Sequence, residues 1–220
     1  MYILHHYPDT ASLILRLILR ELDQPYAERL IDRASGALDS AAYRALHPMG
    51  KIPAMETPDG AMFETAAMLL YLSDRHGNLA PKPGDPARAA FLKWFFFTST
   101  YIHPTLMQLF YPDREAGPAG APMVLTHAAA KMRAYLTLID QTAATNPAWL
   151  SDQHPTILGY YLAVLIRWLG SNPPDHPGCF RSADFPALHR VLTYLESRPA
   201  ALEVAADESL GPTIFTHPAT

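Results

Sequence analysis

The first 78 residues switch repeatedly between strand-like and helix-like spacing of apolar side chains. Four short apolar or alternating runs predict strands, at residues 2–5, 26–32, 52–56 and 61–64. Three segments with helical spacing separate or follow them, at residues 12–22, 40–46 and 65–77. We expect Ser12 and Thr65 to be the N-caps of the first and third helices and Gly77 to end the third. The predicted order is β-α-β-α-β-β-α.

The pattern changes after the Pro/Gly-rich connector PKPGDP at residues 81–86, which predicts a domain boundary. Strand-like runs stop there, and four helical segments follow, at residues 87–112, 122–145, 156–169 and 184–197. Residues 112–122 and 170–178 are rich in Pro and Gly and predict loops. The segment 156–169 is apolar on nearly every face, which is typical of the central helix of a bundle. We therefore expect an α+β protein with domains at 1–80 and 86–212, the second all-helical.

Composition narrows the possible partners. The chain has 17 basic and 21 acidic residues and no run of Lys or Arg, which argues against nucleic acid. Its most apolar windows are too short, or too interrupted by Arg, to span a bilayer, and its start does not resemble a signal peptide. Cys179 is the single cysteine, which excludes a disulfide framework. We expect a soluble cytoplasmic protein that does not act on membranes.

Metal binding is not expected. Ten histidines are scattered along the chain, and the adjacent His5 and His6 would point to opposite faces of a strand. The sequence contains no metal-ligand spacing such as HExxH and no Cys/His cluster.

Pro53 stands inside a strand-like run, where proline would normally remove a hydrogen bond of the sheet. A cis Ile52–Pro53 bond would leave the amide and carbonyl of Ile52 facing outward, so that a peptide ligand could pair there. The alternative is an ordinary trans proline at the start of a strand.

Glu64 and Thr65 stand at the junction of a strand and a helix and also have two interpretations. Thr65 could be a plain N-cap and Glu64 a solvated charge. Alternatively, the helix N-terminus with the Thr65 hydroxyl binds a carboxylate, and Glu64 holds an ammonium group. The second interpretations of Pro53 and of Glu64-Thr65 suggest one ligand, a short peptide with a free amino-acid end.

The stretches HPMGKIPAM, PDG and ETAAMLLYLSD together resemble the signature of the N-terminal domain of glutathione transferases. The predicted order of elements matches as well, so the resemblance covers the whole chain, and it is closest to bacterial members of the Ser type. It implies a thioredoxin-like βαβαββα domain followed by an all-helical bundle.

The resemblance also implies binding roles for five residues. Ile52 would pair through its backbone with the cysteinyl unit of glutathione, next to Pro53 as the cis proline. Lys51 would lie near the glycyl carboxylate, and Glu64 and Thr65 would hold the γ-glutamyl end. Thr65 replaces the commoner Ser of the family and keeps its hydroxyl.

The position that activates the thiol is left open by the resemblance. Ser12 matches the serine of Ser-type members, with Thr10 and Tyr7 as the next candidates. Ala11 stands where bacterial Cys-type members carry cysteine, so mixed-disulfide chemistry is not expected. The alternative for Ser12 is a helix cap without a catalytic role.

Three further residues of the second domain are candidates for the second-substrate pocket, namely Tyr101, His103 and Met107. At helical spacing such residues are otherwise core or interface. Thr156 can cap the central helix, although Gly159 replaces the carboxylate that would complete a capping box.

The resemblance implies a homodimeric enzyme that conjugates glutathione, as co-substrate, to a small hydrophobic electrophile, a detoxification reaction. A second enzyme interpretation uses the same thiol for isomerisation, dehalogenation or peroxide reduction. A third interpretation is a non-catalytic glutathione-binding or interaction protein, in which the hydroxyl does not reach the sulfur.

Overall fold

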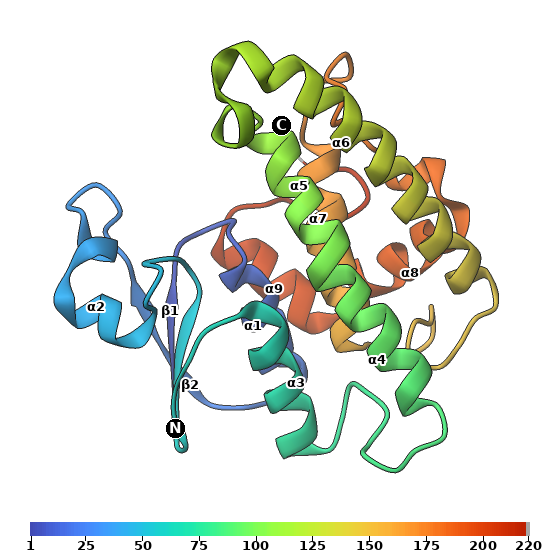
Figure 1. The fold of residues 1–220 in the computed structure, drawn as a ribbon. Helices are drawn as coiled ribbons and strands as arrows, with labels where there is room; N and C mark the ends of the chain where they lie inside the picture. Colours follow the sequence, from blue (N-terminus) through green and yellow to red (C-terminus); the bar gives the residue numbers. More distant parts are fainter. Residues whose placement is uncertain (219–220) are drawn as a thin grey trace. The chain divides into compact units, whose positions relative to one another are not determined.

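The computed structural model describes residues 1–218 and divides into two compact units, one from Met1 to Asn78 and one that begins at Leu79 (Figure 1). The division falls shortly before the connector at 81–86. Within residues 1–218, no helix is both long enough and apolar enough to cross a membrane.

The first unit is built on a mixed sheet of four strands in the order β2-β1-β3-β4. Its strands are β1 (Tyr2–His6), β2 (Tyr26–Leu30), β3 (Ala54–Thr57) and β4 (Gly60–Met62). β1 runs parallel to β2 and antiparallel to β3, and β3 runs antiparallel to β4. The strands begin or end within two residues of their predicted limits, and the predicted order of elements is confirmed.

Helices cover both faces of this sheet (Figure 1). They are α1 (Ser12–Glu21), α2 (Ala41–Leu46) and α3 (Thr65–His76), with a short 3-10 turn η1 (Ala37–Asp39) before α2. α1 and α3 lie side by side on one face, and α2 lies on the other. Leu4 is fully buried, whereas its neighbour His5 points to the opposite face and meets the ring of Tyr43 on α2. The alternation of β1 therefore gives each face its own core.

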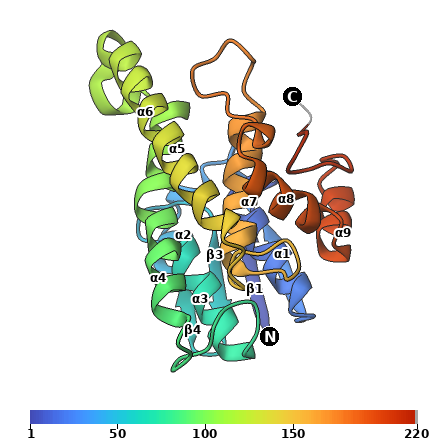
Figure 2. The same ribbon diagram turned by 90° about the vertical axis from the view of Figure 1, so that its right-hand side faces the viewer.

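All the secondary-structure elements in the described part of the second unit are helices or helical turns. Its elements are α4 (Arg88–Phe97), a π-helical turn η2 (Thr98–Ile102), α5 (His103–Phe110), α6 (Asp113–Ala144), α7 (Ile157–Gly170), a 3-10 turn η3 (Ser182–Asp184), α8 (Pro186–Glu196) and α9 (Pro199–Asp207). α5 and α6 run side by side (Figure 2). Nearly every residue of α7 is buried, as expected for the central helix of a bundle. The α+β class, a thioredoxin-like domain followed by a helical domain, is confirmed.

One prediction about the second unit is wrong, namely the loop at residues 112–122. Residues 113–122 are helical, because α6 starts at Asp113 and is interrupted at Ala116 and Gly117, where Gly117 has φ 66°. Pro118 follows this break directly, a position where a helix tolerates proline, so the Pro/Gly content marks a break and not a loop. The predicted helix 87–112 is present as the continuous run of α4, η2 and α5, with the π turn η2 inside it, and α9 was not predicted.

Thr156 caps α7 as predicted, because its hydroxyl accepts the amide N–H of Gly159 at 2.9 Å. Thr156 is 5% exposed, so water cannot easily replace this bond. We expect Thr156→Ala to lower the free energy of unfolding by about 1 kcal/mol, measured by urea denaturation. Thr156→Ser keeps the oxygen and is the matched control. An equal loss in both variants would contradict a capping role.

Candidate functional site

Three segments meet at one end of the sheet of the first unit. β1 ends at His6, and His5 pairs with Ala54, the first residue of β3. β4 ends at Met62, which pairs with Met55 near the start of β3. The loop after β1, the segment before β3 and the junction between β4 and α3 therefore lie at the same end of the sheet.

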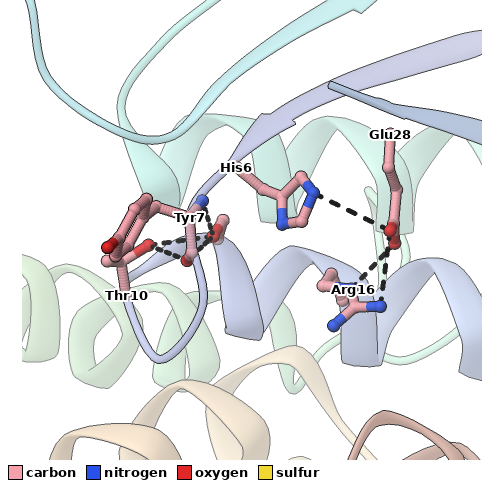
Figure 3. Close-up of polar contacts among 6 residues, drawn as sticks. His6, Tyr7, Thr10, Arg16 and Glu28 are labelled. Atoms are coloured by element: carbon pink, nitrogen blue, oxygen red, sulfur yellow. Dashed lines mark hydrogen bonds and ion pairs between the residues drawn. The ribbon is translucent and has the colours of Figure 1, made fainter. Parts of the chain in front are cut away.

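The loop after β1 gathers its hydroxyl groups around the backbone of Tyr7 (Figure 3). The carbonyl oxygen of Tyr7 accepts hydrogen bonds from the Thr10 hydroxyl at 2.7 Å and the Ser12 hydroxyl at 3.0 Å. The Ser12 oxygen accepts the N–H of Tyr7 at 3.3 Å and lies 2.9 Å from the Thr10 oxygen. The structure thus brings together the three residues predicted as candidates for thiol activation.

The prediction that Ser12 is an N-cap is wrong. The N-cap of α1 is Ala11, which is already in the helical region at φ −59°, and Ser12 is the first helical residue. The Ser12 hydroxyl turns back to the end of β1 because the N–H and C=O of Tyr7 are available there. Ser12 has no exposed surface, whereas Thr10 is partly exposed. Thr10 is therefore the hydroxyl that a bound molecule reaches more directly.

The ring of Tyr7 is partly exposed and carries a neighbouring positive charge. The guanidinium carbon of Arg33 lies 5.0 Å from the ring centroid. A cation over an aromatic face is attracted to it. Arg33 was not singled out from the sequence, because the residues next to it in the chain give no sign that it contacts Tyr7.

A charged network lies beside this loop (Figure 3). Arg16 of α1 donates from Nε to Glu28 of β2 at 2.8 Å and from a terminal nitrogen at 3.4 Å. The Nε2 atom of His6 lies 3.8 Å from the same carboxylate. Burial raises the pKa of Glu28, but the hydrogen bond and charge of Arg16 outweigh it, so the pKa lies below its usual value. The network joins α1, β1 and β2 where the loop begins.

The residues of the segment before β3 differ in their exposure to solvent. The Ile52–Pro53 peptide bond is cis, and Pro53 is buried. Lys51 is exposed and Ile52 is partly exposed. Ile52 also packs against a small core of Ile31, Tyr43 and Ala54.

His47 connects this segment with the start of α3. Its Nδ1 accepts the N–H of Met49 at 3.3 Å, and its ring lies 4.9 Å from the ring of Phe63. Burial lowers the pKa of His47, and the charge of Glu64 opposes this shift. Glu64 is thus close enough to His47 for their charges to interact.

The prediction that Thr65 is an N-cap is also wrong. Glu64 is the N-cap of α3 and Thr65 is the first helical residue, and the Glu64 side chain accepts no capping hydrogen bond from the first turn. Glu64 has φ 70°, which is unusual for a residue with a side chain. Backbone strain of this kind is concentrated at functional sites. Glu64 is exposed and Thr65 is 8% exposed, at a helix end whose first amides have no intrahelical acceptor.

The three pocket candidates of the second unit differ in exposure. Tyr101 is 50% exposed and stacks on Phe97, and Met107 is 38% exposed. His103 is packed, because its Nδ1 is hydrogen-bonded to the Tyr161 hydroxyl at 2.8 Å and its ring approaches Trp168. Burial lowers the pKa of His103 to about 4.

Across residues 1–218, no three His, Cys, Asp or Glu side chains are grouped so that they could hold a metal ion. His5 is engaged with Glu56 at 2.8 Å and His6 with Glu28, on opposite faces of β1. Both histidines are therefore part of local networks of the sheet.

The fold defines a class of protein in which a thioredoxin-like domain precedes a helical domain. Residues 4–82 match the family model described as the N-terminal domain of glutathione S-transferase. A glutathione S-transferase (GST-4.5) of Xanthomonas campestris is 28% identical over 170 residues, covering 75% of this chain and 81% of its own. Residues 4–82 therefore belong to the N-terminal domain family of glutathione S-transferases, and the two matches support the resemblance found in the sequence.

Other relatives show how broad the family is. The disulfide-bond oxidoreductase YfcG of Escherichia coli is 24% identical and covers 90% of this chain and 91% of its own. A glutathione transferase homologue from Sulfitobacter, solved with bound glutathione, superposes with a TM-score of 0.78 at 21% identity. It covers 94% of this chain and 98% of its own, a similarity that concerns the fold.

Proposed function

We propose that the protein is a glutathione transferase, which binds reduced glutathione at this end of the sheet and transfers its thiolate to a small hydrophobic electrophile. The observation that carries the proposal is the convergence of three segments there, each with a different chemical group. They supply hydroxyls from the loop after β1, the cis Ile52–Pro53 peptide bond before β3, and a carboxylate beside a helix N-terminus.

The proposed binding roles follow from this chemistry. The N-terminus of α3 with the Thr65 hydroxyl attracts the carboxylate of the γ-glutamyl unit, and Glu64 holds its ammonium group. Ile52 pairs through its backbone with the cysteinyl unit next to Pro53. The exposed Lys51 offsets the glycyl carboxylate.

Thiol activation requires a modest free energy. A free thiol with a pKa near 8.5 is only about 3% ionised at pH 7, and lowering that pKa by two units takes about 2.7 kcal/mol. One hydroxyl that donates to a charged acceptor contributes about 1.5–3 kcal/mol, and a helix N-terminus up to about 2 kcal/mol. A single donor at the start of α1 is therefore sufficient in magnitude.

We assign the donor to Thr10 in preference to Ser12, because Thr10 is partly exposed and Ser12 is buried. Ser12 supports it, since its oxygen lies 2.9 Å from that of Thr10. When Thr10 turns its proton to a bound sulfur, the Tyr7 carbonyl keeps its hydrogen bond from Ser12. Tyr7 remains the third candidate.

The remaining proposals concern assembly and location. We propose a cytoplasmic homodimer with a role in detoxification, as the family membership suggests. The relative named as a disulfide-bond oxidoreductase supports a second candidate, in which the same thiol is used for reduction. Isomerisation and dehalogenation use the same site.

The proposal is tested by calorimetry with reduced glutathione, followed by a conjugation assay with a chloro-dinitro-aromatic substrate. Heat of binding together with turnover would support the transferase. Binding without turnover, in this assay and in peroxide reduction, would indicate the non-catalytic glutathione-binding protein. Absence of binding would overturn the proposal.

Glu64→Gln tests the ammonium site. Removing the carboxylate charge should weaken glutathione binding about five- to thirtyfold, because one charge-assisted hydrogen bond at an exposed position is lost. Asp74→Asn makes the same change of charge on the exposed surface of α3 and is the control. If the Glu64→Gln variant and the unmodified protein bind glutathione with equal affinity, Glu64 does not bind the ammonium group.

A further inference from the structure

We propose that Tyr43 is a positioning residue of the glutathione site, because its hydroxyl fixes the peptide group that precedes Ile52. The inference rests on the proposed function and extends it to a residue of α2, outside the segments described above. The Tyr43 hydroxyl donates to the carbonyl oxygen of Lys51 at 2.7 Å.

This carbonyl belongs to the same planar peptide group as the N–H of Ile52. The Lys51–Ile52 bond is trans, so its C=O and N–H point in opposite directions. By holding the carbonyl on the side of α2, Tyr43 turns the Ile52 N–H to the other side, where the cysteinyl unit would pair. A rotation of this plane would misdirect the donor that the ligand needs.

Tyr43 is itself held firmly. Its N–H is accepted by the Ser40 hydroxyl at 3.1 Å, and its carbonyl accepts the N–H of His47 at 2.9 Å. Its ring meets that of His5 on β1 at 5.9 Å, edge to face, and the residue is 5% exposed. The hydroxyl therefore has a defined position relative to the sheet.

Burial raises the pKa of Tyr43 to about 12. The hydroxyl stays protonated, and able to donate, across the pH range of an assay. The bond to Lys51 is thus a constant feature and not a titrating one.

The remainder of the segment is held against the same helix. Arg44 donates to the carbonyl of Pro48 at 2.7 Å and to Asp39 at 2.6 Å. Gly50 has φ 59°, and a Cβ there would lie 2.7 Å from the carbonyl oxygen of Leu38. This close approach admits only glycine without a shift of the backbone, so α2 and η1 determine the path of the chain up to Lys51.

Tyr43→Phe removes the hydroxyl and keeps the ring. We expect the KM and Kd for glutathione to rise about two- to twelvefold, the range for one lost hydrogen bond, with kcat within about twofold of the unmodified enzyme. The change appears in binding because the reacting groups on the loop after β1 are untouched. Both constants come from steady-state kinetics and calorimetry.

The matched control is Tyr2→Phe. Tyr2 is also 5% exposed, and its hydroxyl is hydrogen-bonded to His76 at 2.9 Å, at the start of β1 and away from the site. Tyr2→Phe should lower stability in a similar way and leave KM unchanged. Circular dichroism confirms that each variant is folded at the assay temperature, and if Tyr43→Phe is not folded there, both variants and the unmodified protein are assayed at a lower temperature at which all three are folded.

The outcomes are separable. A raised KM in Tyr43→Phe and an unchanged KM in Tyr2→Phe support the inference. An unchanged KM in Tyr43→Phe, or an equal rise in both variants, overturns this inference while the proposed function stands. If the unmodified protein binds no glutathione, the proposed function is overturned and the role of Tyr43 with it.

Discussion

Thr10→Val should lower kcat/KM for glutathione conjugation about 10- to 150-fold, the equivalent of one hydroxyl that donates to a charged sulfur. Valine keeps the branched shape of threonine and removes the hydroxyl that bonds the Tyr7 carbonyl. The pKa of bound glutathione, followed by the ultraviolet absorbance of its thiolate, should rise in this variant. That second readout separates loss of activation from loss of fold.

Ser12→Ala is the matched comparison. It removes a buried hydroxyl that accepts the N–H of Tyr7, so it should lower the stability of the fold. It should reduce activity less than Thr10→Val does. The opposite order, with Ser12→Ala inactive and Thr10→Val close to the unmodified enzyme, would assign the donor to Ser12. Full activity of both variants would leave Tyr7 as the candidate donor to the sulfur.

Stability should fall by about 2 kcal/mol between pH 7 and pH 5 because of His103 alone. Burial lowers its pKa from 6.5 to about 4, so below pH 6.5 the unfolded chain binds a proton that the folded chain excludes. The contribution of His103 is complete above pH 6.5 and is lost as the pH falls towards 4. Burial also lowers the pKa values of His47 and His76, so protonation of these two histidines also destabilises the fold as the pH falls.

His103→Asn tests this expectation. Asparagine can still offer a partner to the Tyr161 hydroxyl near the position of Nδ1, but it does not titrate. The variant should be less stable at pH 7 and show a shallower loss of stability from pH 7 to pH 5, measured by urea denaturation at each pH. Identical slopes for both proteins would contradict the assignment to His103.

The order of elements in the first unit was predictable because each run of apolar residues has one clear period. The second unit was less predictable, since helix periodicity does not reveal a π turn such as η2, where the helix continues with a wider hydrogen-bond ring. The break at Gly117 was misread for a related reason. Proline after a break is compatible with a helix, whereas proline and glycine counted together predict a loop.

The candidate site was predictable as a set of residue types and not as geometry. Ser12 and Thr65 were both expected to be caps, but each is the first residue inside its helix. The sequence pattern of a helix start locates a capping hydroxyl only to within one residue. Tertiary contacts decide whether that residue is the N-cap or the first residue of the helix. Tyr43 carried no signal at all, because its partner is a backbone carbonyl eight residues away in the sequence.

The π turn at Thr98–Ile102 has a consequence for how this protein tolerates insertions and deletions. Each residue added to or removed from a helix rotates all that follows by about 100°. Since η2 passes without a loop into α5, a length change there would swing Leu106 and Leu109 away from the bundle interior. Relatives that differ in length in this region must therefore rebuild the helical core or compensate within the same turn.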